Sequence, residues 1–145
     1  MPNRWAILLA AAAVVEVMAL GGALSQPKTK PNLDYGFYKA RVEPIFLKKK
    51  AGHTRCVVCH SESNNFFKLE AMSAGAKAWN DEQSRKNFEV MQRVAAPGNL
   101  KSRLLLHPLA EEAGGDFFHN GGKHFTSQDD MEWQTLKAFV LGQSR

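Results

Sequence analysis

The only two cysteines of this 145-residue chain stand three positions apart and are followed at once by a histidine, in the run Cys56-Val57-Val58-Cys59-His60. On one helical turn, residues i and i+3 share a face, so both thiols point to one side with the imidazole beside them. Two cysteines are too few for a multi-bridge disulfide scaffold or a four-cysteine zinc site. This single turn therefore constrains the fold more than any other feature of the sequence.

The Cys-x-x-Cys-His pattern is the attachment signature of c-type haem. Cys56 and Cys59 would form thioether links to the two vinyl groups of one porphyrin, and His60 would be the proximal iron ligand. Zinc requires four ligands, and the chain has no second Cys-x-x-Cys and no His-x-x-x-His. A dithiol redox site is expected near a βαβ unit, which the sequence does not predict. We therefore expect one covalent haem c.

The apolar periodicity predicts helices. A first helix is expected over residues 34–49, capped by Asp34 and kinked at Pro44. Its predicted buried stripe is Phe37, Val42, Ile45 and Phe46. A second helix is expected over residues 81–94, where Asn80 and Gln83 have the spacing of a capping box.

The rest of the chain continues this pattern. A short helix is expected over residues 101–106, and four glycines indicate a loop over residues 110–126. The last helix is expected to start at Ser127, with Asp130 completing a second capping box, and to stop at Gly142. No segment shows the two-residue alternation of a strand, so the sequence predicts an all-α fold with long loops.

The first 25 residues are almost wholly apolar, with Arg4 and Glu16 as their only charges. Twenty helical residues span about 30 Å, the thickness of the hydrocarbon core of a bilayer. We expect residues 1–25 to be a membrane anchor or signal segment, and favour an uncleaved anchor because basic residues follow it. Residues 26–33 form a polar linker, and residues 34–145 form the single globular domain.

The net charge of +5 is confined to one stretch of the chain. Residues 26–50 hold seven Lys and Arg against two acidic residues, whereas residues 51–145 hold eleven of each sign. We therefore expect no nucleic-acid partner. The run Lys48–Lys50 is interpreted as a solvated helix end or, alternatively, as a docking patch for an acidic partner.

The order of these features resembles class I monohaem cytochromes c. In that family a helix precedes Cys-x-x-Cys-His, a C-terminal helix packs across it, and a loop before the last helix supplies the sixth ligand. The resemblance covers residues 34–142. The stretch His119-Asn120-Gly121-Gly122 is similar to a bacterial subgroup with His-x-Gly-Gly before the last helix. The resemblance implies a cytochrome c-like fold and single-electron transfer by one iron.

The sixth ligand departs from the methionine usual in that family. The later methionines, Met72, Met91 and Met131, are expected to pack in the core or fill gaps. Family logic places the distal ligand in the glycine-rich loop, so His119 is the leading candidate, with His124 and His107 as alternatives. Bis-histidine ligation would give a lower reduction potential than a His/Met pair.

These features predict an electron carrier rather than an enzyme. It would be exported and tethered at the periplasmic face of the cytoplasmic membrane, or soluble in the periplasm if residues 1–25 are removed. Its partner would be a membrane electron-transfer complex, either a respiratory complex or a photosynthetic reaction centre. Two alternatives stay open: a haem peroxidase or gas sensor with a labile sixth ligand, and an assembly subunit of a membrane complex.

Overall fold

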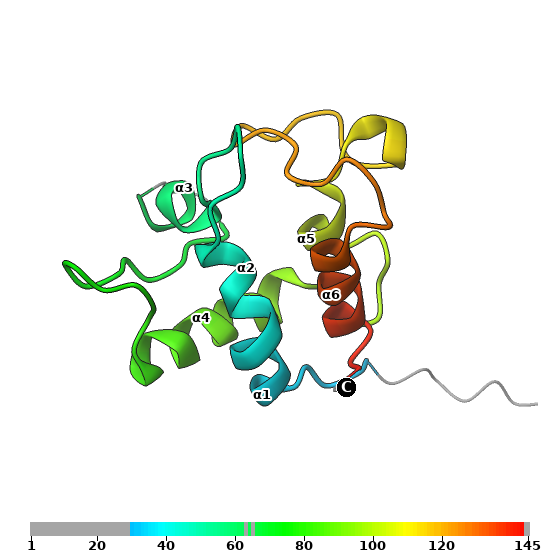
Figure 1. The fold of residues 1–145 in the computed structure, drawn as a ribbon. Helices are drawn as coiled ribbons and strands as arrows, with labels where there is room; N and C mark the ends of the chain where they lie inside the picture. Colours follow the sequence, from blue (N-terminus) through cyan, green and yellow to red (C-terminus); the bar gives the residue numbers. More distant parts are fainter. Residues whose placement is uncertain (1–29, 63, 65, 144–145) are drawn as a thin grey trace, which may run out of the picture.

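The computed structural model describes residues 30–62, 64 and 66–143, and within them the fold is all-α, as expected (Figure 1). An isolated parallel bridge between Leu109 and Phe125 is the only strand-like pairing among these residues. The elements, in chain order, are α1 (Tyr35–Phe37), η1 (Tyr38–Val42), α2 (Glu43–Leu47), α3 (Cys56–Glu62), α4 (Asp81–Val94), α5 (Arg103–Leu106), η2 (Glu111–Ala113) and α6 (Met131–Val140).

The first helix is one continuous helix made of α1, η1 and α2. Asp34 caps its start, as predicted, because its carboxylate accepts the backbone N–H of Phe37 at 2.5 Å. The middle part, η1, is a π-helix, in which the N–H of Glu43 bonds the carbonyl of Tyr38. These wider turns lie directly before Pro44, whose missing N–H interrupts the regular ladder. The helix ends at Leu47 rather than at residue 49, because Lys48 is already extended.

Helix α4 has the predicted bounds. The side chain of Asn80 accepts the N–H of Gln83 at 2.9 Å, and the Gln83 side chain accepts the N–H of Asn80 at 3.1 Å. This capping box satisfies two backbone donors at the helix start. Met91 is fully buried, as expected for a core residue.

A buried charge joins α4 to the first helix. The ammonium group of Lys39 bonds Glu43 Oε1 at 2.7 Å and Ser84 Oγ at 2.6 Å. Glu43 and Ser84 are both buried, so these bonds satisfy polar groups that water does not reach.

The last two α-helices start later than predicted. Ser102 caps α5, which begins at residue 103 instead of 101. The expectation that the last helix starts at Ser127 is wrong: α6 begins at Met131, and Asp130 is its N-cap, accepting the N–H groups of Glu132 and Trp133. Met131 therefore lies at the first helical position and is 79% exposed, so the expectation that it packs in the core is also wrong.

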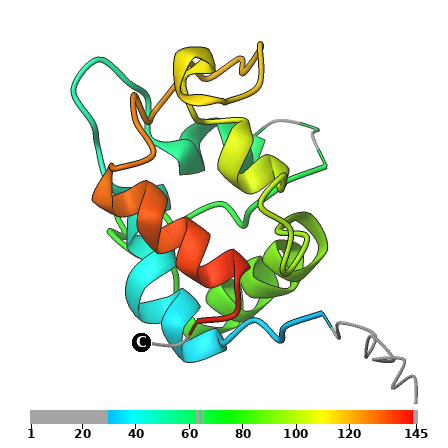
Figure 2. The ribbon, with the colours of Figure 1, turned by 90° about the vertical axis from the view of Figure 1, so that its right-hand side faces the viewer.

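Helix α6 crosses the first helix at the centre of the core (Figure 2). The ring of Phe139 lies 6.4 Å from Phe37 and 6.1 Å from Tyr38 on the first helix. It also lies 6.4 Å from Phe88 on α4. These aromatic contacts join three helices that are far apart in the sequence, and aromatic pairs at this spacing stabilise a core.

The predicted anchor or signal segment, residues 1–25, lies outside the described residues, as do residues 26–29 of the linker. None of the helices within residues 30–143 that the structure describes is long and apolar enough to cross a membrane.

Candidate cofactor site

Helix α3 carries both cysteines and the histidine of the signature on one short helix. Val57 on this helix is buried in the core, and it fixes the helix against the fold. Cys56 is half-buried and Cys59 is exposed, and neither forms a disulfide. The helix thus presents the two thiols and His60 beside one another.

The imidazole of His60 is oriented by the chain that follows α3. Its Nδ1 lies 2.8 Å from the carbonyl oxygen of Phe67. A carbonyl only accepts, so Nδ1 carries the hydrogen and the lone pair lies on Nε2. Metal-ligating histidines commonly donate their second ring N–H in this way. The Phe67 ring packs against the imidazole with the ring centres 4.5 Å apart.

Cys56, Cys59 and His60 line a cavity of about 760 Å³. Its size lies within the ~300–1,000 Å³ range of small-molecule and cofactor sites. The end of α5 and the loop before α6 contribute all three candidate distal histidines to the lining: His107, His119 and His124. In Figure 1, α3 lies on the left and α5 on the right, and the loop before α6 runs across the top between them.

The lining of the cavity combines apolar and basic side chains. Phe66 is 83% exposed and Phe118 is 63% exposed, although both line the cavity. Large exposed aromatic side chains at a cavity wall indicate a surface that binds an apolar partner. The charged residues of the described lining are all basic, namely Arg55, Arg93, Lys101 and Arg103. The chemistry of the lining therefore fits a large apolar ligand that carries negative charge.

His119 has the arrangement of a metal ligand. Its Nδ1 lies 2.6 Å from the carbonyl oxygen of Gly122, so Nδ1 donates and Nε2 keeps the lone pair, as in His60. Burial, with added repulsion from His107 and His60, lowers the pKa of His119 below its usual value, although the bond to Gly122 opposes the shift. A lowered pKa keeps the imidazole neutral, which is the form that binds metal.

His60 and His119 both line the cavity, and their rings lie close together. The ring centres are 6.3 Å apart and the ring planes differ by 23°. The two residues are 59 positions apart in the sequence. Within the part of the chain that the structure describes, no three His, Cys, Asp or Glu side chains gather closely enough to hold a metal ion.

His107 and His124 use their ring nitrogens differently. Nδ1 of His107 donates to Asp116 Oδ2 at 2.6 Å, and its Nε2 accepts from Arg103 at 2.8 Å. Nε2 of His124 lies 3.0 Å from the carbonyl of Thr54, so this nitrogen donates. In both residues Nε2 is engaged by the protein, whereas Nε2 of His119 has no hydrogen bond within the described residues.

Burial raises the pKa of the Cys56 thiol to about 11. A thiol with a raised pKa is protonated at neutral pH, and it is a poor nucleophile for disulfide exchange.

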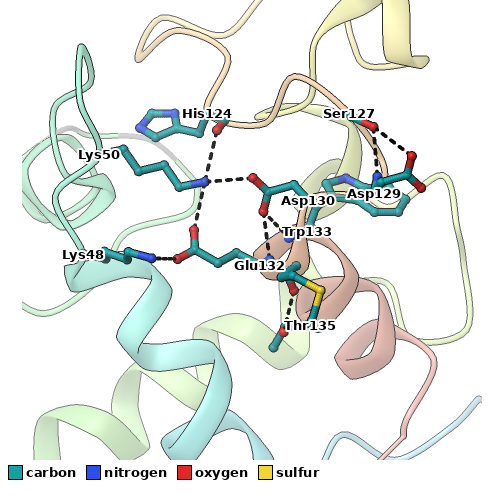
Figure 3. Close-up of polar contacts among 10 residues, drawn as sticks. Lys48, Lys50, His124, Ser127, Asp129, Asp130, Glu132, Trp133 and Thr135 are labelled. Atoms are coloured by element: carbon teal, nitrogen blue, oxygen red, sulfur yellow. Dashed lines mark hydrogen bonds and ion pairs between the residues drawn. The ribbon is translucent and has the colours of Figure 1, made fainter.

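The three lysines of the run Lys48–Lys50 make different contacts, which the sequence does not predict. Lys48 forms an ion pair with Glu132 at 2.6 Å, and Lys49 bonds the carbonyl of His53. Lys50 is largely buried and bonds several groups at the start of α6 (Figure 3). Lys123, in the glycine-rich loop, donates to the carbonyls of His107 and Asp116 and so pins the loop to α5.

No protein-family model, curated protein or solved structure matches this chain.

Proposed function

We propose that this protein is a monohaem c-type cytochrome, similar to class I cytochromes c, that carries single electrons to or from a membrane redox complex. Cys56 and Cys59 would hold haem c by thioether links, and His60 and His119 would be its axial ligands. The observation that carries the proposal is the pair His60 and His119, which line one cavity with ring centres 6.3 Å apart and with their Nδ1 atoms bonded to carbonyls.

The spacing of these two rings fits one iron between them. A first-row metal binds an imidazole nitrogen at about 2.0 Å, and each ligating nitrogen lies about 1.1 Å from its ring centre, so two such ligands would hold their centres about 6.2 Å apart. The observed separation is 6.3 Å. Two protein ligands are too few for a closed metal site, and a haem would itself supply the remaining donors to the iron.

The walls of the cavity also fit this group. A haem has two apolar faces, which would cover the exposed rings of Phe66 and Phe118. Its two propionates would offset part of the positive charge that Arg55, Arg93, Lys101 and Arg103 bring to the lining. The crossing of α6 over the first helix agrees with the family resemblance.

The chain's own residues would set the properties of the site. A haem held by these residues would supply single-electron chemistry between ferrous and ferric iron. The carbonyls of Phe67 and Gly122 hold His60 and His119 in the ligating tautomer and so raise their basicity. The apolar side chains of the lining exclude water, which keeps the local dielectric low and contributes to the potential. Bis-histidine ligation favours a lower potential than a His/Met pair.

Export and membrane attachment rest on residues 1–25. Haem c is joined outside the cytoplasm, so the domain would lie at the periplasmic face of the cytoplasmic membrane, tethered by this segment or soluble if it is cleaved. A tether would keep the carrier near a respiratory complex or a photosynthetic reaction centre and raise its effective concentration there.

The test is a reduced-minus-oxidised absorption spectrum of the purified full-length protein, with a redox titration. We expect a six-coordinate low-spin c-type spectrum that becomes five-coordinate in His119→Ala, while His124→Ala leaves it unchanged. A high-spin ferric spectrum of the wild-type protein would instead favour the peroxidase or gas-sensor alternative. Electron transfer by a partner complex containing the Cys56→Ala/Cys59→Ala chain would favour the assembly subunit.

A further inference from the structure

Lys50 lies where the segment before α3, the end of the loop before α6 and the start of α6 come together (Figure 3). Its side chain is only 20% exposed. The ammonium group lies 2.9 Å from Glu132 Oε2 and 3.4 Å from Asp130 Oδ2 at the start of α6. It also lies 3.2 Å from the carbonyl oxygen of His124, and 4.2 Å from the centre of the Phe125 ring.

These contacts join the two halves of the site. Lys50 stands in the segment between α2 and α3, six residues before Cys56. His124 and Phe125 end the loop that carries His119, and both line the cavity. Phe125 is buried and exchanges backbone bonds with Pro108 and Ala110, so the loop end is also fixed to the chain after α5. One partly buried cation thus joins the cysteine side of the cavity to the His119 side, and the bond from His124 Nε2 to the carbonyl of Thr54 joins the same two segments.

Lys48 offers a contrast on the same carboxylate. It bonds Glu132 Oε1 at 2.6 Å, but its side chain is 62% exposed, and the carboxylate is its only ion-pair partner among the described residues. An exposed ion pair contributes little, whereas a partly buried cation shared by several acceptors is screened less. The two lysines therefore share an acidic partner and differ in whether they hold the loop.

We propose that Lys50 is a positioning residue for the sixth iron ligand. By holding the end of the loop against the segment before α3, it keeps His119 at ligating distance from the His60 side of the cavity. Without this tie the loop would open more often, because loops with few buried contacts open locally at low cost. This inference rests on the proposed function, since it requires a haem between the two histidines.

The experiment compares Lys50→Met with Lys48→Met in the full-length, haem-loaded protein. Both substitutions remove a positive charge that pairs with Glu132, and both keep a long side chain, which is now apolar. The first readout is the rate of carbon monoxide binding to the ferrous protein, which depends on the fraction of molecules with His119 dissociated. The second is amide hydrogen exchange of residues 116–125. We expect Lys50→Met to bind carbon monoxide about tenfold faster, equivalent to about 1.4 kcal/mol in the opening equilibrium. Its loop should also exchange faster, while Lys48→Met changes either readout less than about twofold.

Equal changes in the carbon monoxide rate in the two variants would overturn the proposal, because the loss of a cation beside Glu132 would then explain the change without the loop contacts of Lys50. An unchanged carbon monoxide rate in a Lys50→Met protein that is less stable to urea would overturn it too, because the role would be structural only. If Lys50→Met does not fold, Asp130→Asn replaces it: asparagine keeps the N-cap but removes one anionic partner. Faster carbon monoxide binding in Asp130→Asn supports the tie, and an unchanged rate refutes it. A wild-type protein that binds no haem, or holds it without His119, would overturn the proposed function itself.

Discussion

Replacing Gly122 by alanine tests how the loop orients His119. Gly122 has a φ of +79°, a left-handed conformation that costs an L-residue about 1–2 kcal/mol. An added Cβ would meet His53 Nδ1 at 3.6 Å, an ordinary contact, so the cost comes from the backbone and not from a clash. Rotating the backbone to relieve this strain would move the carbonyl that accepts from His119. If the strain falls on the ligated conformation alone, the fraction of open molecules rises about 5- to 30-fold. Carbon monoxide binding to the ferrous protein should accelerate by the same factor.

Gly75→Ala is the matched control for this change. Gly75 has a φ of +75° with no other atom within 4 Å of an added Cβ, and it lies in the turn before α4, away from the cavity lining. Gly75→Ala should lower the urea midpoint by about as much as Gly122→Ala does, and it should leave the rate of carbon monoxide binding unchanged. The reasoning is refuted if Gly122→Ala lowers the urea midpoint without accelerating carbon monoxide binding, or if both variants accelerate it equally.

Three further predictions concern the fold. Phe139→Ala removes a ring that is 1% exposed and should cost about 3–5 kcal/mol in urea denaturation. Phe117 is 84% exposed, so Phe117→Ala should change the free energy of unfolding by less than about 0.5 kcal/mol. Similar losses in Phe139→Ala and Phe117→Ala would contradict the core packing described. Burial alone would raise the pKa of Glu132, but bonds to Lys48 and Lys50 hold it below the usual 4.5. Glu132 therefore stabilises the fold above pH 4.5, and this stability is lost as the pH falls through the pKa that Glu132 has in the folded protein. Between pH 5 and acid denaturation, Glu132→Gln should lose less stability than the wild-type protein. If the free energy of unfolding of Glu132→Gln fell with pH below pH 5 as steeply as that of the wild-type protein, this coupling would be refuted. Asn80→Ala removes the capping box of α4 and should cost about 1 kcal/mol, whereas Asn80→Ser should cost little; equal losses in thermal denaturation would argue against the cap.

The elements that the sequence predicted well are those whose signals are local. The capping box of Asn80 and Gln83 lies within four residues, and α4 has its predicted bounds. The sequence predicts that the last helix starts at Ser127 with Asp130 completing its capping box, whereas Asp130 is itself the N-cap of α6. The choice of Asp130 is reinforced by Lys50, which bonds its carboxylate from 80 positions away. No local pattern contains that information.

The same limit applies to the candidate site. The sequence places three histidines before the last helix, and it favours His119 only through the resemblance of His119-Asn120-Gly121-Gly122 to the family's His-x-Gly-Gly stretch. What distinguishes His107 and His124 is the use of Nε2, which Arg103 and Thr54 engage, and Thr54 is 70 positions from His124. Likewise, three adjacent lysines look equivalent in the sequence, but only Lys50 turns into the protein. The Cys-x-x-Cys-His turn, by contrast, can be recognised in the sequence because all of its residues lie within five positions.

The central claim is that one haem is covalently held at Cys56 and Cys59, with His60 and His119 as ligands. The most direct measurement is the mass and absorption spectrum of the full-length protein after acidic organic extraction, which removes haem that is not covalently bound. The account predicts one haem retained per chain, located on the peptide that contains residues 56–60, and a six-coordinate low-spin spectrum before extraction. A chain that releases its haem on extraction, or that carries none when produced with the haem-attachment machinery, would contradict it.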